Sequence, residues 1–197
     1  MPPDATETKR RILAAARAEF AEYGLAGARV DRIAETASAN KRSIYVHFGV
    51  KERLFDIVIE QTIAQLEVEV PFTADDLPGY GGALFDFIVA NPLLGRVSVW
   101  AQLERAEATA VETTAYAAKV AALTAQGDAE AVDTLALALG LVTSWFMASP
   151  ALRAAASDEP WSDKRLREHR AALTAAIAAL QSRAALRSRA ALQSRRS

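Results

Sequence analysis

Residues 30–49, VDRIAETASANKRSIYVHFG, constrain the fold of this chain more than any other stretch. Apolar residues recur in its first part at three- and four-residue spacing, which places them on one face of a helix: Val30, Ile33, Ala34 and Ala37. Ile44 and Phe48 repeat this spacing after a short polar break. The stretch therefore predicts two short amphipathic helices joined by a tight turn, which is a helix-turn-helix unit.

The second of these helices presents polar side chains on its outward face. Asn40 precedes it and is a good N-cap, because its side chain can accept from a backbone donor in the next turn. The outward donors suit phosphates and the edges of bases in a major groove: Lys41, Arg42, Ser43, Tyr45 and His47. We interpret the stretch as a DNA-reading element. The alternative is ordinary packing, because two amphipathic helices with a polar turn occur in many all-α proteins.

The flanking sequence favours the DNA-binding interpretation. Residues 8–24 read TKRRILAAARAEFAEYG, and residues 24–58 read GLAGARVDRIAETASANKRSIYVHFGVKERLFDIV. Together they closely resemble the N-terminal domain of the tetracycline-repressor (TetR) family of bacterial transcription factors. The matching features are Ile12/Leu13, Phe20, Gly24, the Ile33-Ala34 pair, the run Ile44-Tyr45-x-His47-Phe48, and Lys51-Glu52. The resemblance covers under a third of the chain.

The resemblance implies a role for each polar residue of this region. Lys41, Arg42 and Ser43 match the family's main base-edge readers. Tyr45, His47 and Lys51 match phosphate contacts, and Arg29 stands where a Ser or Thr commonly caps the second helix and can reach a phosphate instead. For His47 the alternative is that the ring only packs or is solvated.

Two positions depart from the family pattern. Ser38 occupies the turn position that is usually a glycine in a left-handed conformation, at a cost of ~1 kcal/mol. Arg42 is long where relatives often carry a small residue, and a guanidinium there can pair bidentately with a guanine. The operator is therefore expected to differ from those of relatives with a small residue at this position.

Composition points to an all-α protein without metal, cofactor or catalytic site. Alanine and leucine are abundant, and the chain of 197 residues contains no cysteine, which excludes disulfides and thiolate metal sites. Two histidines 122 residues apart, with no HExxH motif and no recognisable Ser/His/Asp spacing, argue against a helical enzyme. The sequence has no membrane-length apolar run and no signal peptide, so we expect a soluble, cytoplasmic protein that does not contact membranes.

The net charge of −1 conceals a strong segregation along the chain. Residues 1–55 hold ten basic and seven acidic side chains, residues 56–163 hold four and sixteen, and residues 164–197 hold nine and one. A weakly acidic total does not exclude DNA binding, because the charge clustered on one face decides it. Lys9, Arg10 and Arg11 cluster near the start of the first predicted helix, where the family's first helix approaches the DNA backbone.

The sequence predicts a first helix over about residues 6–23, ended by Gly24, with Ile12, Ala16, Phe20 and Tyr23 buried. A linking helix is predicted over 50–70, followed by a break at 71–82. Further helices are predicted at about 82–90, 93–106, 108–126, 129–148 and 162–182. The segment 129–148 is apolar on nearly every face and must be buried on all sides. In the family, the last two helices of two subunits form a four-helix dimer bundle, so the resemblance implies a homodimer.

The C-terminal residues 178–195 form a six-residue repeat, AALQSR-AALRSR-AALQSR. Six residues advance a helix face by about 240°, so the leucines fall on three different sides. We expect the repeats after the first to be a basic, frayed or disordered extension of the last helix, with an extended helix as the alternative. We interpret its arginines as a solvated tail, with nonspecific affinity for DNA as the alternative.

The expected organisation has three parts: a three-helix helix-turn-helix DNA-binding domain at 1–58, an α-helical ligand-binding and dimerisation domain at 59–182, and a basic low-complexity tail at 183–197. The resemblance implies a pocket for a small, apolar molecule, with these expected lining residues: Trp100, Leu103, Tyr116, Trp145 and Phe146. The expected function is a dimeric regulator, a repressor released from a near-palindromic operator in double-stranded DNA by a hydrophobic effector. Activation instead of repression, an enzyme, or an interaction module that has lost DNA binding are the alternatives.

Overall fold

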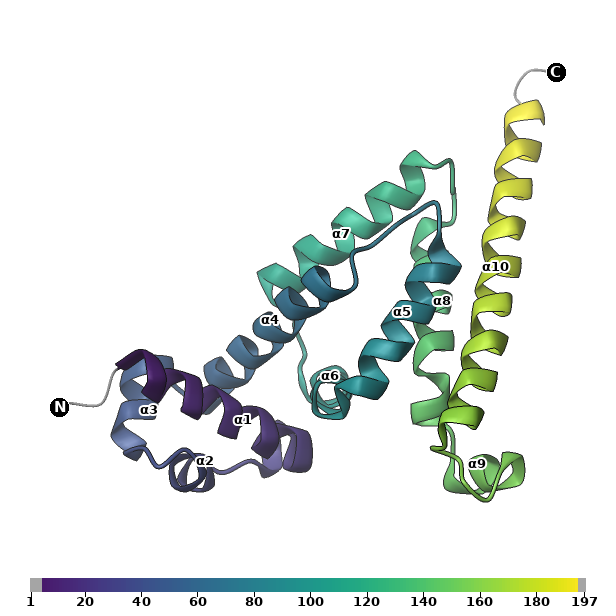
Figure 1. The fold of residues 1–197 in the computed structure, drawn as a ribbon. Coiled ribbons are helices and arrows are strands. Elements are labelled where there is room, and N and C mark those ends of the chain that lie inside the picture. Colours follow the sequence, from purple (N-terminus) through teal and green to yellow (C-terminus); the bar gives the residue numbers. More distant parts are fainter. Residues whose placement is uncertain (1–4, 195–197) are drawn as a thin grey trace. The chain divides into compact units, whose positions relative to one another are not determined.

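A computed structural model gives the fold of the chain and describes residues 5–194, with side chains described for residues 6–183. Over the described residues the fold is all-α, as predicted, with ten helices (Figure 1). Their bounds are α1 Ala5–Gly27, α2 Val30–Thr36, α3 Lys41–Phe48, α4 Lys51–Glu69, α5 Leu77–Ala90, α6 Pro92–Glu104, α7 Ala110–Ala125, α8 Ala131–Met147, α9 Pro150–Ala156 and α10 Asp163–Ser194.

The helices form two compact units that are not simple successive segments of the chain. The first unit combines residues 1–68 with residues 88–113, and the second combines residues 69–87 with residues 114–197. Helix α6 therefore packs with the N-terminal helices, although the sequence division at residue 58 assigns it to the second domain. The functional division into 1–58, 59–182 and 183–197 stays a prediction.

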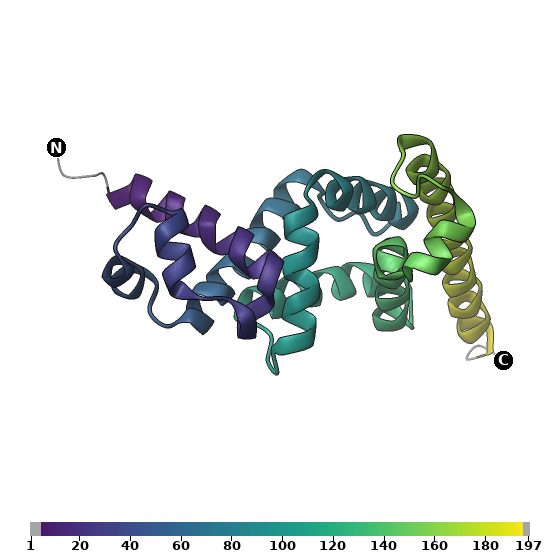
Figure 2. The ribbon, with the colours of Figure 1, turned by 90° about the horizontal axis from the view of Figure 1, so that it is seen from below.

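The core of the first unit is built from α1 and the helices around it. Ile12, Ala16 and Phe20 of α1 are fully buried, as predicted, and the ring of Phe20 meets that of Phe55 edge-on at 4.9 Å. Tyr23 was expected in this stripe but is 47% exposed, and its ring stacks against the guanidinium of Arg32 at 4.2 Å instead of packing in the core. Helix α6 lies against α1 (Figure 2) and contributes Val97 and Ala101 to the same core; Leu54, Val58 and Ile59 come from α4.

Gly24 interrupts the first helix, as predicted, and a second short helical segment follows it within α1. Gly24 has a positive φ of 66°, as expected, but its ψ of −175° makes a kink, after which the helix continues to Gly27. The backbone N–H groups of Leu25 and Ala26 donate to the Glu104 carboxylate of α6, and this replaces intrahelical bonds lost at the kink. The indole of Trp100 donates to the carbonyl of Ala21 at 3.3 Å. Helix α6 therefore holds the kinked end of α1 in place.

The predicted break at 71–82 is too long, because α5 begins at Leu77 and the GYGG sequence lies inside this helix. A Cβ on Gly81 would collide with Ile177 of α10, and one on Gly82 would come within 2.8 Å of the Arg170 guanidinium. The glycines therefore permit a close approach between α5 and α10 in the second unit, and they do not mark a loop.

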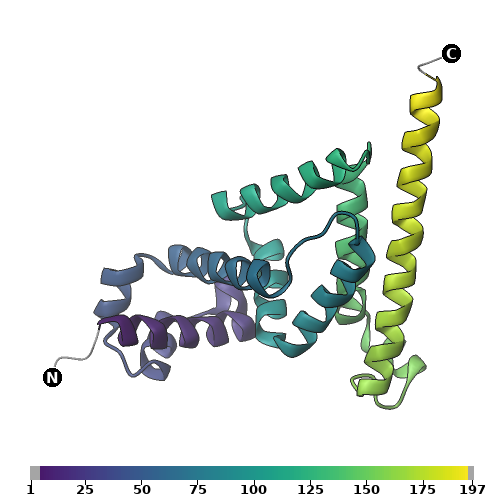
Figure 3. The ribbon, with the colours of Figure 1, turned by 45° about the horizontal axis from the view of Figure 1, so that its top comes forward.

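Helices α8 and α10 lie side by side in the second unit, and α10 is one unbroken helix (Figure 3). Because α10 continues to Ser194, the repeats after the first are helical, which corrects the expectation of a frayed or disordered extension. The sequence analysis also missed α9, a short helix whose N-cap Ser149 accepts a hydrogen bond from the Leu152 N–H at 3.1 Å.

Helix α8 is buried on one side only within a single chain, so its predicted burial on all sides stays a prediction. Leu135, Val142 and Trp145 are buried, whereas Leu137 and Met147 are 55% and 62% exposed. The apolar residues therefore form one face against the chain's own core and a second face that the chain leaves uncovered.

Among residues 5–194 no single helix is both long enough and apolar enough to cross a membrane. Only two bent pairs, α5 with α6 and α8 with α9, reach that length and composition jointly. In the same described part of the chain, no three His, Asp or Glu residues are grouped as metal ligands.

Candidate DNA-binding surface

Helices α2 and α3 are joined by the tight turn that the sequence predicts. The Ala37 N–H donates to the Ile33 carbonyl at 2.9 Å as α2 ends, and Ser38 has a φ of 47°. This confirms the left-handed, non-glycine turn position. The side chain of Asn40 then accepts from the Arg42 N–H at 2.8 Å, which confirms it as the N-cap of α3.

Helix α3 buries one narrow face and exposes the rest. Ile44 and Phe48 are 1% and 7% exposed and pack into the core of the first unit. The polar side chains predicted to face DNA lie outside that face: Lys41, Arg42, Tyr45 and His47 are exposed, and Ser43 is half-buried. The structure therefore places the predicted readers of α3 on one short helix with a solvent-facing surface.

Lys41 is the first residue of α3, and its ammonium forms an ion pair with Asp31 of α2 at 2.8 Å. The hydrogen bond and the attraction of that carboxylate raise the pKa of Lys41. Both side chains are largely exposed, at 47% and 74%, so the pair contributes little to stability. A phosphate or base edge can therefore replace Asp31 at small cost.

Arg29 lies at the N-cap of α2 without a side-chain cap of its own. Its backbone N–H donates instead to the carboxylate of Glu19 in α1 at 2.8 Å. The same oxygen of Glu19 accepts from Arg32 Nε at 2.8 Å, and Arg32 also donates to the Gly27 carbonyl at 2.9 Å. Glu19 thus caps α2 from another helix and leaves the Arg29 side chain exposed. The sequence analysis missed Glu19, because nothing local to α2 identifies a cap supplied ten residues earlier.

Lys51, the first residue of α4, is half-buried and folds back toward the end of α1. Its ammonium donates to the carbonyl oxygens of Ala28 at 3.1 Å and Ala26 at 3.4 Å. These carbonyls lie at the C-terminal end of α1, where a cation is favourable. Lys51 therefore has a structural role in the free protein beside its predicted phosphate contact.

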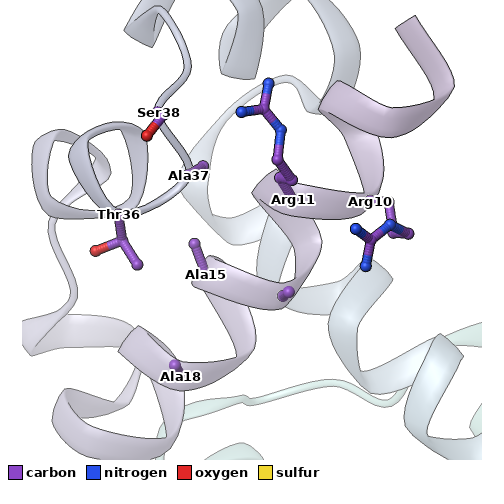
Figure 4. A pocket seen from close by; sticks show the side chains of 8 residues that line it. Arg10, Arg11, Ala15, Ala18, Thr36, Ala37 and Ser38 are labelled. Carbon is purple, nitrogen blue, oxygen red and sulfur yellow. The ribbon is translucent and has the colours of Figure 1, made fainter. Parts of the chain in front are cut away.

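A hollow of about 350 Å³ lies beside the helix-turn-helix (Figure 4). Its α1 wall is formed by Arg10, Arg11, Ala14, Ala15 and Ala18, and Thr36, Ala37 and Ser38 form the other wall. Arg10 is held by Glu7 through two hydrogen bonds of 2.8 and 2.6 Å. None of the residues predicted to contact an effector lines this hollow.

The five predicted effector residues do not all fall in one unit. Trp100 and Leu103 belong to the first unit, where Trp100 packs against α1 and Leu103 is 70% exposed. Tyr116, Trp145 and Phe146 belong to the second unit, where Tyr116 is 49% exposed. A common pocket for the five remains a prediction.

Trp145 and Phe146 belong to an aromatic cluster that the sequence analysis identified only in part. Phe146 lies 5.5 Å from Phe85 and 5.9 Å from Trp161, and Trp145 lies 5.0 Å from the ring of His169. Burial, and then the positive charge of Arg165, lower the pKa of His169. The cluster is not purely apolar, because the Arg165 guanidinium lies 5.0 Å from the Trp145 ring and that of Arg153 lies 5.2 Å from the Trp161 ring.

Two families match the chain, and together they cover most of it. Residues 12–58 match bacterial regulatory proteins of the tetR family, and residues 76–179 match the tetracyclin repressor-like C-terminal domain. The second match alone covers more than half of the chain. The chain therefore belongs to the TetR family of transcriptional regulators, a family without enzymatic activity.

Individual relatives agree with this assignment. The chain is 44% identical over 124 residues to the HTH-type transcriptional repressor SCO4008 of Streptomyces coelicolor, covering 61% of this chain and 65% of that protein. It is 33% identical over 95 residues to the repressor NicS of Pseudomonas putida, covering 45% of each chain. The alignments thus span less than two thirds of either relative. The crystal structure of the regulator SCO4942 from Streptomyces coelicolor superposes with a TM-score of 0.74 at 38% identity, covering 86% of this chain and 96% of that one.

Proposed function

We propose that this protein is a dimeric transcriptional repressor that binds a near-palindromic operator and leaves it when a small apolar effector binds. The observation that carries the proposal is the exposed polar face of α3, whose orientation is set by a buried Ile44–Phe48 pair. Two relatives, SCO4008 and NicS, are named as repressors, which favours repression over activation.

The readers of DNA in this proposal are the residues that the sequence identified. Arg42 and Ser43, together with Lys41, contact base edges from the start of α3, where the N-cap Asn40 fixes the helix. Tyr45 and His47 contact phosphates, as do Arg29 and Lys51. Because Lys41 and Lys51 already have partners within the chain, DNA binding must exchange those partners for the nucleic acid.

Dimerisation is supported by the uncovered faces of α8 and α10. Val132, Leu137 and Met147 of α8 are more than half exposed. Between residues 171 and 179 the exposed positions of α10 are all alanine: Ala171, Ala172, Ala175, Ala178 and Ala179. Small residues permit the close approach of a second helix. Removal of the apolar side chains of α8 from water lowers the free energy of the dimer. Burial of these two faces between two copies accounts for both patterns.

The effector in this proposal contacts the aromatic cluster of the second unit. Trp145 and Phe146 are the predicted residues that lie in this cluster, and Tyr116 belongs to the same unit. Trp100 and Leu103 would instead act through α6 and its contact with the end of α1. By linkage, the effector must lower DNA affinity by the same factor by which DNA lowers effector affinity.

Selection of duplexes from a randomised library tests the proposal. The expected winners contain two inverted half-sites whose centres are about 34–36 Å apart, one turn of B-DNA. Addition of apolar aromatic compounds should release the selected duplex and change Trp fluorescence. Recovery of no preferred sequence would overturn sequence-specific binding, and release only by charged metabolites would overturn the apolar effector.

A further inference from the structure

Val46 is exposed on the recognition helix although it is apolar. It is 69% exposed, more than the 45% of the neighbouring Tyr45. Successive helix residues are about 100° apart, so Val46 lies about 180° from the midpoint between Ile44 and Phe48. Since those two residues face the core, Val46 occupies the centre of the outward face of α3.

The same geometry places Arg42 beside Val46. The two residues are one helical turn apart, at i and i+4, and therefore lie on the same outward side. Tyr45 and His47 each lie about 100° from Val46, on the flanks of the helix. The predicted phosphate contacts Tyr45 and His47 therefore lie on the flanks, and the predicted base reader Arg42 lies near the centre.

The chemistry of Val46 excludes most roles at a DNA interface. Its side chain has no hydrogen-bond donor or acceptor, so it cannot hold a phosphate or read a polar base edge. In the major groove the only apolar group on a base edge is the C5 methyl of thymine. An isopropyl group that points into the groove is therefore complementary to one base, and it leaves polar groups of any other base edge without a partner.

On this geometry, and resting on the proposed function, we propose that Val46 is a specificity-determining residue that selects thymine in each half-site by contact with its C5 methyl. Because Arg42 lies one turn away and suits guanine, the thymine is expected within one or two base pairs of the guanine read by Arg42. The pair Arg42–Val46 then defines the centre of each half-site.

The test uses the duplex selected by the wild-type protein, with each thymine replaced in turn by deoxyuridine, which lacks only the C5 methyl. One replacement per half-site is expected to weaken wild-type binding about fourfold. This factor corresponds to the ~0.8 kcal/mol that burial of one methyl group contributes. Val46→Ala should bind thymine and deoxyuridine duplexes equally at that position. The matched control is Val68→Ala, at a valine that is 82% exposed at the end of α4, and it should retain the fourfold preference.

Three outcomes separate this inference from the proposed function. Failure of the wild-type protein to select any duplex would overturn the proposed function itself. A selected duplex in which no deoxyuridine replacement weakens binding, or in which Val46→Ala keeps the preference, would overturn the role of Val46 alone. A melting temperature of Val46→Ala equal to that of the wild type is expected, since the side chain is exposed.

Discussion

The carboxylate of Glu19 in α1 accepts a hydrogen bond from the backbone N–H of Arg29 at 2.8 Å, and in this way one helix caps the next. Glu19 is 9% exposed and also pairs with Arg32 at 2.6 Å. Glu19→Ala should therefore lower the free energy of unfolding by ~1–3 kcal/mol, the cost of a buried donor left unsatisfied.

Urea unfolding measures this loss. Glu19→Gln keeps an oxygen acceptor for the Arg29 N–H while removing the charge, so it should destabilise less than Glu19→Ala. If both variants unfolded at the wild-type midpoint, the cap would make no contribution to stability.

Gly24 combines a positive φ with close packing against α6. A Cβ there would lie 2.8 Å from the ring of Trp100, whereas a Cβ at Gly49, also at positive φ, meets nothing within 4 Å. Gly49→Ala should cost about 1–3 kcal/mol for the backbone alone. Gly24→Ala should cost about 1–3 kcal/mol more, because overpacking is added. Equal losses in thermal unfolding would argue against tight packing of α6 on the kink.

Arg42 and His47 should affect DNA binding in different ways. Arg42→Ala should relax preference at one base pair per half-site by ~1–3 kcal/mol. His47→Ala should weaken binding to all sequences and flatten its salt dependence, because phosphate contacts act through counterion release. Binding to a randomised operator library at several salt concentrations distinguishes them. Unchanged relative affinities for Arg42→Ala would exclude base reading.

Lys51 requires an additional control in the same experiment. Lys51→Gln also removes hydrogen bonds to the carbonyls of Ala26 and Ala28, so its melting temperature must be measured beside its DNA affinity. A lower melting temperature is expected from the lost hydrogen bonds, and weaker, less salt-dependent DNA binding well below that temperature is the result expected for a phosphate contact.

Leu137 provides a test of dimerisation that leaves the core of the chain intact. Because it is 55% exposed within one chain, Leu137→Glu should fold but dissociate, and sedimentation should give the mass of a single 21.2 kDa chain. Val68→Glu, at an 82% exposed position of the first unit, should sediment as the wild type does. A compact wild-type monomer at micromolar concentration would contradict the dimer.

The imidazole of His169 lies 3.3 Å from the Ser144 hydroxyl, among the aromatic rings of the second unit. Burial and Arg165 lower its pKa in the folded state, so the unfolded chain binds its proton more readily. The stability that neutral His169 contributes is present above its ordinary pKa of about 6.5 and is lost as the pH falls through the lowered folded value.

His169→Gln should therefore flatten the decline in unfolding free energy between about pH 7 and pH 5. If unfolding free energy fell equally steeply with falling pH in His169→Gln and the wild type, His169 would not be the cause of the decline.

Local patterns in the sequence predicted the local features of this fold. Asn40 and the left-handed Ser38 follow from the chemistry of a few neighbouring residues, and both are confirmed. The features that were missed depend on contacts between distant segments. Gly81 and Gly82 look like a loop until α10 is packed against them, and Glu19 caps a helix to which it does not belong.

The candidate site, too, was predicted where local patterns sufficed and missed where distant contacts decide. The polar residues of α3 were predicted from helical spacing and family resemblance, but Val46 was not, because an isolated valine in a sequence gives no sign of its exposure. Trp100 was assigned to a pocket from the family resemblance and its apolar character. Its hydrogen bond to the Ala21 carbonyl, across 79 positions of sequence, could only be found in the folded chain.

The most direct test of the central claim is the stoichiometry of the complex with DNA. A labelled duplex from upstream of the protein's own gene should be retarded in a gel at nanomolar to micromolar protein in competition with unrelated DNA. Sedimentation of that complex should give two chains per duplex. Binding that unrelated DNA abolishes equally, or a complex of one chain per duplex, would contradict the account.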